Sequence, residues 1–380
     1  MTEIDNIDDG AFAEILRLVR AIDKTTVRNN VRAVSKRCGV LYDSSVKFMV
    51  LSTGPIPFPS DWSRFPALRK IDLSRRYDLL DLSPLSSCST LTSLDVSACR
   101  NLSHLGPLAS CRALESLDLS YCNMIKDISH LSGISATLKD LNIAHTDVTD
   151  LSALSSCSSL SSLNINGTGV SSLEPLSKCR ALQTLIAYYC HLVDTSAFAS
   201  LPALEILCIS HIEDFSTIAS CHALTELYLY DDERFTDLSV IASCPALRVL
   251  SINGCHRIKD ISAVALCPVL RELSINYLEE VSDFSAISLC KSLEHLSMKG
   301  VMIDDLTPIT SCSALKFLNI TECSDIEDVS PLARCSSLKR LIVDKELLET
   351  CRQYTSHVAF VGDNQAADEQ AVKEWINSSN

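Results

Sequence analysis

The strongest constraint on the fold of this chain is a short leucine phrase that recurs along most of its length. The phrase Leu-x-x-Leu-x-[Leu/Ile/Val] occurs thirteen times at intervals of 20 to 24 residues, with Ile71, Ala187 and Met298 as single substitutions. Its copies begin at Leu68, Leu91, Leu114, Leu138, Leu160, Leu182, Leu204, Leu224, Leu247, Leu270, Leu293, Leu315 and Leu338. A fixed period of this size predicts stacked coils that each contact only their neighbours, rather than a globule.

The size and the ends of the chain limit where it works. The 380 residues would be many for one compact core, but stacked coils avoid that limit. No stretch of eighteen apolar residues occurs, so the sequence argues against a membrane span. The acidic start, residues 1–9, has no basic segment and no apolar run, so we expect no secretory signal and a cytoplasmic location, with the nucleus also open.

Most of the net charge of −14 comes from the repeat itself. Ten acidic residues occupy the same place in successive repeats: Asp81, Asp127, Asp150, Asp194, Asp214, Asp237, Asp260, Asp283, Asp305 and Asp328. We therefore interpret this acidity as turn chemistry. It also argues against nucleic-acid binding, which favours basic surfaces.

The eighteen cysteines follow the repeat as well. Ten of them stand three residues before a repeat leucine: Cys88, Cys111, Cys157, Cys179, Cys221, Cys244, Cys267, Cys290, Cys312 and Cys335. Phe65 and Leu201 take that place in two other repeats, so it is an apolar core position where cysteine serves as a small hydrophobe. No Cys-x-x-Cys pair occurs, which argues against zinc, and we expect reduced thiols.

One coil shows the predicted local structure. In the copy that begins at Leu114, the leucines point inward and the residues between them alternate outward, as in a β-strand. One strand in each coil predicts a parallel sheet. Further along, Asp-Leu-Ser-Pro-Leu at residues 81–85 is a helix-start signal, in which we expect the serine hydroxyl to cap and proline to fit the first helical position. About eight residues remain before the next strand, which predicts a short 3-10 or single α turn.

These motifs resemble the leucine-rich repeat superfamily over residues 65–343. The period near 22 with the Asp-Leu-Ser-Pro-Leu motif is similar to internalin-style short repeats, and the Ser-x-Cys and Cys-Ser-x-Leu variants resemble repeat proteins of trypanosomatid parasites, some described as adenylate cyclase regulators. The resemblance implies an α/β solenoid of horseshoe shape, with a parallel β-sheet on the concave face and short 3-10 or α turns on the convex face. It also implies a protein that binds other proteins.

The N-terminal residues 1–45 form a predicted helical cap of the solenoid. Apolar residues at helical spacing, among them Phe12, Ile15 and Leu16, predict a first helix, and a second stripe runs from Val27 to Leu41. The run Ala33–Leu41 resembles the second helix of an F-box, although Cys38 stands where tryptophan is common and the leucine-proline opening is missing. A plain two-helix cap and an F-box-like pair that binds a Skp-type adaptor both remain open.

The other boundaries follow from the pattern. The solenoid should span residues 46–343, with an opening strand at Val46–Leu51, and residues 344–380 should form a C-terminal cap and polar tail. Within that cap we predict a helix from Lys345 to Tyr354 and a short strand at 357–361.

No catalytic motif is present in the sequence. It has no glycine-rich phosphate loop, no His-Glu-x-x-His and no nucleophile elbow, and its nine histidines lack metal-ligand spacing. We therefore predict no enzyme activity, no catalytic residue, no cofactor and no metal.

The candidate site is a change in composition on the predicted concave face. The outward residues of the first repeats are small or acidic, such as Asp95 and Ser97, whereas the middle repeats gather aromatic and amide side chains. Tyrosine is enriched in binding hot spots, although these rings could instead cover neighbouring coils. The predicted partner-binding residues are Tyr188, Tyr189, His211, Tyr228, Tyr230, Asp231, Asn276 and Tyr277.

Three functions remain open from the sequence. The chain could be a scaffold that binds a protein on its concave face, including a substrate receptor of a cullin-type ubiquitin ligase if residues 1–45 are an F-box. It could instead be the regulatory subunit of an enzyme such as a phosphatase or adenylate cyclase. A structural component of a large assembly is the third.

Overall fold

The computed structural model describes residues 46–51, 62, 65–230, 232–355 and 357–360. They fall into two compact units, divided between Asn164 and Ile165, which we call the first unit and the second unit. The predicted helices of residues 1–45 and the tail 361–380 lie outside the described residues.

The first unit repeats one coil of a strand followed by a 3-10 turn. Its strands pair in parallel and in chain order: β1 (Phe48–Val50), β2 (Lys70–Asp72), β3 (Ser93–Asp95), β4 (Ser116–Asp118), β5 (Asp140–Asn142) and β6 (Ser162–Asn164). The turns between them are η2 (Ser83–Ser87), η3 (Gly106–Ser110), η4 (Ser129–Ile134) and η5 (Ser152–Ser156). The opening strand is thus shorter than the predicted Val46–Leu51.

The second unit continues the same pattern. Its parallel strands are β7 (Thr184–Ala187), β8 (Ile206–Ile209), β9 (Glu226–Tyr230), β10 (Val249–Asn253), β11 (Glu272–Ser274), β12 (His295–Ser297), β13 (Phe317–Asn319), β14 (Arg340–Ile342) and β15 (Ala359–Phe360). Its turns are η6 (Glu174–Lys178), η7 (Ser196–Ser200), η8 (Phe215–Ser220), η9 (Ser239–Ser243), η10 (Ser262–Leu266), η11 (Ser285–Leu289), η12 (Thr307–Ser311) and η13 (Ser330–Arg334). The helix predicted near the C-terminus is α4 (Lys345–Tyr354).

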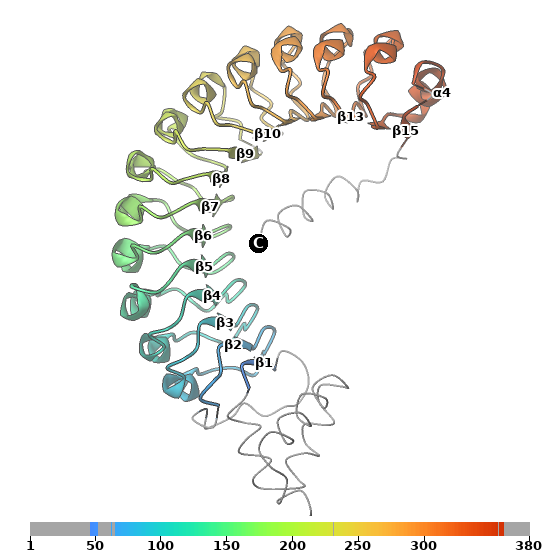
Figure 1. Ribbon diagram of the computed structural model, residues 1–380. Helices are drawn as coiled ribbons and strands as arrows, with labels where there is room; N and C mark the ends of the chain where they lie inside the picture. The colour runs from blue at the N-terminus through green and yellow to red at the C-terminus, as the bar shows by residue number, and fades with distance from the viewer. Residues whose placement is uncertain (1–45, 52–61, 63–64, 231, 356, 361–380) are drawn as a thin grey trace, which may run out of the picture. The chain divides into compact units, whose positions relative to one another are not determined.

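In each unit the strands lie along one side of the coils and the 3-10 turns along the opposite side (Figure 1). We number positions from the first leucine of each phrase, so that positions 0, +3 and +5 point into the coil. Leu114, Leu117 and Leu119 are 0–1% exposed, which confirms the predicted inward set. Positions +2, +4 and +6 point outward, and we call the surface that they form the strand face.

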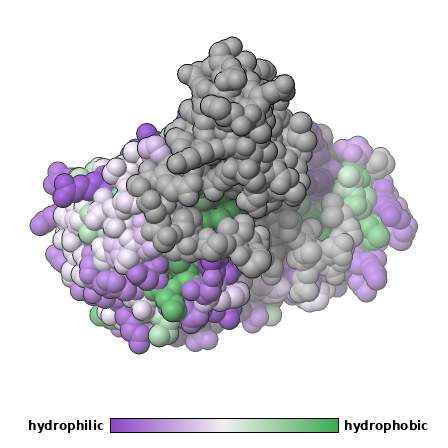
Figure 2. All heavy atoms as spheres, turned by 90° about the horizontal axis from the view of Figure 1, so that it is seen from below, coloured by the Kyte–Doolittle hydropathy of each residue, from purple (hydrophilic) through white to green (hydrophobic). Residues whose placement is uncertain are grey.

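The surface outside the coils is largely polar. Figure 2 shows one face on which hydrophilic residues cover most of the described surface and hydrophobic residues form separate areas. Some large apolar side chains are nevertheless exposed, such as Leu80 and Met124. The apolar content of the chain is therefore mostly enclosed in the coils.

The repeated aspartates bind the backbone at the start of the 3-10 turns, and Asp214 is itself the N-cap residue of its turn. Each of the ten accepts a hydrogen bond from the backbone N–H two residues later, at 2.6–3.0 Å, as Asp81 Oδ1 does from Ser83 N. The prediction that the serine hydroxyl caps was wrong, because in Ser83 the hydroxyl donates to the same Asp81 oxygen at 2.8 Å. The hydrogen bonds from the Ser83 side chain and backbone hold the pKa of the Asp81 carboxyl below its usual range.

The seventeen described cysteines are all buried thiols, as predicted for core positions. Many of them donate to a backbone carbonyl of the preceding coil, as Cys122 Sγ does to Val96 O at 3.1 Å and Cys312 Sγ to Ile287 O at 3.3 Å. Burial raises the pKa of the Cys111 thiol to about 11. Such thiols are poor nucleophiles, which is consistent with a packing role.

The first turn after each strand requires a left-handed backbone. All eleven described residues with positive φ stand at position +7, with φ of 54–70°, and only three of them are glycine: Arg75, Ala98, Tyr121, His145, Gly167, Tyr189, His211, Gly254, Tyr277, Gly300 and Glu322. This conformation is costly for side chains with a Cβ. Hydrogen bonds to the next coil hold it in place, such as Ala98 N to Ser120 O at 2.7 Å.

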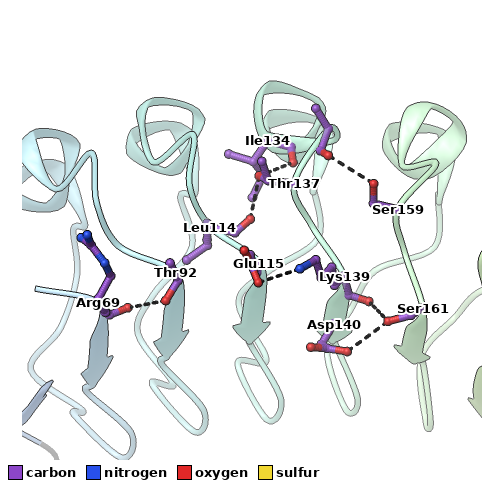
Figure 3. A network of polar contacts seen from close by, with 11 residues as sticks. Arg69, Thr92, Leu114, Glu115, Ile134, Thr137, Lys139, Asp140, Ser159 and Ser161 are labelled. Carbon is purple, nitrogen blue, oxygen red and sulfur yellow. Dashed lines mark hydrogen bonds and ion pairs between the residues drawn. The ribbon is translucent and has the colours of Figure 1, made fainter. Parts of the chain in front are cut away.

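Polar side chains at the start of the strands also join neighbouring coils (Figure 3). Thr92 Oγ1 donates to Arg69 O at 3.1 Å, Ser161 Oγ to Lys139 O at 3.1 Å, and Lys139 Nζ pairs with Glu115 Oε2 at 2.9 Å. These contacts repeat the spacing of the coils, so they stabilise the stack rather than mark a site.

Candidate protein-binding site

The strand face of the first unit is a row of acidic and amide side chains that bind their own backbone. At position +4, the carboxylates of Asp72, Asp95 and Asp118 each accept a hydrogen bond from the N–H two residues later, at 2.8–2.9 Å. Asn142 Nδ2 also donates to Asp118 Oδ2 at 3.0 Å. We call these four residues the aspartate row. Their polar atoms are engaged within and between coils, so this face has a structural role.

The same positions carry apolar and aromatic side chains in strands β7 to β10 of the second unit. Strand pairing places Ile186 beside Cys208 and Cys208 beside Tyr228 at position +4. At position +2 it places Ile206 beside Glu226 and Glu226 beside Val249. We define the tyrosine patch as the apolar and aromatic side chains that are half-buried or exposed on this stretch of the strand face: Ile186, Tyr188, Ile206, Tyr228, Tyr230 and Val249.

Three of the predicted tyrosines come together in this patch. The rings of Tyr188 and Tyr230 meet edge to face, with centroids 6.3 Å apart and an interplanar angle of 70°. Tyr230 is 43% exposed, which leaves much of its ring available to a partner. Burial, together with Cys208, raises the pKa of Tyr188.

Tyr228 is coupled to a carboxylate of the same strand. Its hydroxyl donates to Glu226 Oε2 at 3.3 Å. Burial and the nearby Glu226 charge raise the pKa of Tyr228, so both Tyr188 and Tyr228 stay neutral hydrogen-bonding groups at ordinary pH. Burial raises the pKa of Glu226; its bond with Tyr228 opposes this, while the charges of Glu272 and Glu205 add to it.

Tyr189 and His211 lie beside the patch, at the left-handed position +7. The backbone N–H of Tyr189 donates to Ser210 Oγ at 2.9 Å, and that of His211 donates to Asp232 Oδ2 at 2.5 Å. Their rings are 6.5 Å apart, and Tyr189 is 54% exposed. Asp231, also a predicted binding residue, lies outside the described residues.

Asn276 and Tyr277 have contacts that serve the stack. Asn276 Oδ1 accepts from Ser297 Oγ at 2.8 Å and from the Lys299 N–H at 2.9 Å. The ring of Tyr277 lies 5.8 Å from Lys299 Nζ, and a Cβ added to Gly300 would be 2.6 Å from Tyr277 Cδ1. Both residues are therefore constrained by the next coil, and their part in binding stays a prediction.

Sequence reasoning from aromatic residues missed the aliphatic half of the patch. Ile186, Ile206 and Val249 occupy positions that hold serine, aspartate or asparagine in most of the first unit, such as Ser93 and Asp95. That departure from the repeat was visible in the sequence and could have identified them.

The described residues offer little for chemistry. They contain no group of three or more His, Cys, Asp or Glu side chains that could hold a metal ion. Among the helices described, none is long and apolar enough to cross a membrane.

Comparisons with known proteins support the leucine-rich repeat fold. A family model described as Leucine Rich repeat matches residues 110–128. Among solved structures, an internalin (inlF) from Listeria monocytogenes is 25% identical, with a TM-score of 0.63 over 73% of this chain and 82% of that protein. A leucine-rich repeat protein from Leptospira interrogans is 16% identical, with a TM-score of 0.67 over 86% of this chain and 98% of that protein.

A plant receptor shares the fold as well. The repeat ectodomain of the Arabidopsis thaliana receptor kinase GASSHO1/SCHENGEN3, in complex with CASPARIAN STRIP INTEGRITY FACTOR 2, is 16% identical, with a TM-score of 0.54 over 84% of this chain and 46% of that chain. No match was found among curated proteins.

Proposed function

We propose that this chain, a leucine-rich repeat solenoid, is a non-enzymatic interaction protein that binds a protein partner through the tyrosine patch. The single observation that carries the proposal is the replacement of the repeat's polar strand-face residues by Ile186, Tyr188, Ile206, Tyr228, Tyr230 and Val249 on four adjacent strands. Exposed aromatic and aliphatic side chains that are contiguous on a sheet favour protein association. The plant receptor with the same fold, in complex with its factor, lends support.

The proposal is tested by capture of proteins from the cells that express the chain. A double variant, Ile206→Asp with Tyr230→Ala, should lose the partners that the unaltered chain retains. The matched control changes the first unit: Ser93→Asp also stands at position +2, and Tyr121→Ala also removes an exposed tyrosine. Equal recovery by both double variants would contradict binding at the patch.

A finer form of the proposal concerns residues 1–45. The resemblance of Ala33–Leu41 to the second F-box helix supports a substrate receptor of a cullin-type ubiquitin ligase, in which these helices bind a Skp-type adaptor and the patch holds the target. Pull-down with that adaptor compares the chain with and without residues 1–45. Equal adaptor recovery would leave these residues as a plain cap.

The alternative is a regulatory subunit, which the resemblance to trypanosomatid cyclase-regulator repeats supports. In that case residues 1–45 are dispensable while the tyrosine patch is required, and the captured partner is an enzyme. The same two sets of variants therefore separate the functions. Either form places the chain in the cytoplasm or nucleus, a proposal that imaging of the tagged chain tests.

A further inference from the structure

The tyrosine patch is bordered by carboxylates on the strand face. Glu226 in β9 and Glu272 in β11 both stand at position +2, with Val249 of β10 in register between them. Neighbouring strands are about 4.8 Å apart, so the two glutamates originate about 10 Å from each other. Two half-buried acidic groups thus flank an aliphatic side chain, with the tyrosines of β9 on one side and the serine and asparagine side chains of β10 and β11 beside them.

The charge of Glu226 is not matched by a cation in the part of the chain that the structure describes. Among the described residues, no lysine, arginine or histidine lies within ion-pair distance of its carboxylate, whose hydrogen bond comes from the neutral Tyr228 hydroxyl. Burial and the nearby charges of Glu272 and Glu205 raise its pKa. A partly buried carboxylate without a cation is unfavourable, and a bound cation would remove that cost.

Glu272 is only conditionally paired. His295 Nδ1 lies 3.5 Å from Glu272 Oε1, an ion pair that exists when the ring is protonated. Beyond this point the charge at position +2 changes sign, since Phe317 and Arg340 follow in β13 and β14. Within the second unit, the acidic side chains at position +2 are therefore confined to strands β9 to β11.

The molecule itself shows how a cation binds on this face. At position +2, the Arg340 guanidinium lies 5.2 Å from the centre of the Phe317 ring. Arginine favours such contacts because its planar cation can lie on a ring while donating hydrogen bonds to carboxylates.

We propose that the partner segment recognised by the tyrosine patch is an apolar stretch of polypeptide with arginine or lysine side chains, which bind Glu226 and Glu272 while its apolar residues cover Ile186 and Ile206. This inference rests on the proposed function and adds the chemistry of the partner. The negative charges of Glu226 and Glu272 favour such a segment over an acidic or neutral one.

The test uses three labelled probe peptides and the full chain. They are Leu-Arg-Leu-Arg-Leu-Arg-Leu and its matched versions with glutamine or glutamate in place of arginine, and binding is followed by fluorescence anisotropy. We expect the arginine peptide to bind about tenfold or more tightly than the glutamine peptide, with affinity falling as salt is added. Equal binding of the arginine and glutamine peptides would overturn the inference.

Two double variants localise the effect. Glu226→Gln with Glu272→Gln should bring the affinity for the arginine peptide to within about threefold of that for the glutamine peptide. The control, Glu213→Gln with Glu233→Gln, removes the same charge from exposed loop positions and should leave the preference intact. An equal loss in both double variants would show a general charge effect and overturn the site.

The outcomes distinguish this inference from the function on which it rests. If the glutamine peptide binds as tightly as the arginine peptide and both lose binding in Ile206→Asp, the patch binds polypeptide but the cationic preference is wrong. If Ile206→Asp with Tyr230→Ala alters neither peptide binding nor partner capture, the proposed function itself fails. Thermal unfolding of each variant excludes loss of the fold as the cause.

Discussion

The aspartate row of the first unit and the tyrosine patch of the second unit occupy equivalent positions of the same repeated strand. In the first unit the outward side chains bind the backbone of their own turn, as Asp118 does with the Ser120 N–H. In the second unit Tyr230 at the end of β9 is 43% exposed, and its ring meets Tyr188. The difference shows that the inward leucines suffice to build the coil, so the strand face is free to serve either stability or recognition.

The largest expected effect tests whether the two regions differ only on their outer surface. Leu117→Ala beneath the aspartate row and Leu227→Ala beneath the tyrosine patch each remove a leucine that is 0–1% exposed. Each should lower the free energy of unfolding by about 2–5 kcal/mol. Chemical denaturation of both variants provides the measurement. A much smaller loss for Leu227→Ala would mean that the coils of the second unit are packed differently.

The next effect separates structural from recognition side chains. Asp118→Ala removes the acceptor for Ser120 N and for Asn142 Nδ2, and should cost about 1–2 kcal/mol of stability. Tyr230→Ala removes a partly exposed ring and should cost only about 0.5–1 kcal/mol. Thermal unfolding of the two variants measures both losses of stability. A larger loss for Tyr230→Ala would identify the tyrosine as a packing residue and weaken the proposed site.

Measuring stability as a function of pH extends the comparison to the carboxylates of the two regions. Burial raises the pKa of Asp95; its Ser97 bonds oppose this, and the neighbouring Asp118 and Asp72 add to it. A carboxyl with a raised folded pKa destabilises the fold when ionised, and this penalty disappears as the pH falls through that pKa. Asp95→Asn should therefore raise the unfolding temperature at pH 7, and the gain should shrink toward pH 4. Glu226→Gln should behave alike, because its pKa is also raised.

The turn aspartates supply the opposite control. The pKa of Asp81 is lowered by its hydrogen bonds with Ser83, so its contribution to stability is present above the unfolded pKa and is lost as the pH falls. Asp81→Asn should lower the unfolding temperature at pH 7, with a difference that shrinks toward low pH. The same sign for Asp81→Asn and Asp95→Asn would contradict the assignment of these two roles.

The smallest effect concerns position +7, which both units share. Ala98→Gly and Tyr189→Gly each place glycine at a φ of 54–57°, and each should gain about 0.5–1 kcal/mol of stability. Ala153→Gly, in a 3-10 turn outside the positive-φ set, should instead lose stability by a similar amount. Differential scanning calorimetry is sensitive enough to compare them. Destabilisation by Tyr189→Gly alone would mean that its ring packs on the coil.

The regular part of the fold followed from the sequence because the spacing of the leucines determines it. The inward positions, the parallel sheet, the 3-10 turns and the core place of cysteines such as Cys111 were confirmed. The serine hydroxyl was expected to cap the turns, but in Ser83 it donates to Asp81, which also accepts the Ser83 backbone N–H. Asp and Ser both offer a suitable oxygen, and only the backbone path decides which one reaches that N–H.

The candidate site was predictable in part. Tyr188, Tyr228 and Tyr230 were predicted because tyrosines are conspicuous against a serine-rich background, and their part in binding stays a prediction. Ile206 was not predicted, because an isoleucine in a strand looks like core. Residue identity alone also gave no sign that Tyr189 and His211 stand at a left-handed turn. That conformation belongs to position +7 of the coil, and the glycines at the same position of other repeats, Gly167, Gly254 and Gly300, were the available sign.

The many thiols buried in the coils affect whether the protein can refold after heat denaturation. While the chain is folded, burial raises the pKa of thiols such as Cys122 and Cys267 to about 12, so they react slowly. Unfolding exposes many cysteines together and returns them to an ordinary pKa, at which oxidation joins coils in incorrect register. Without a reductant, heat denaturation of this chain should then be a one-way event governed by the rate of opening, and its apparent melting temperature should depend on the scan rate.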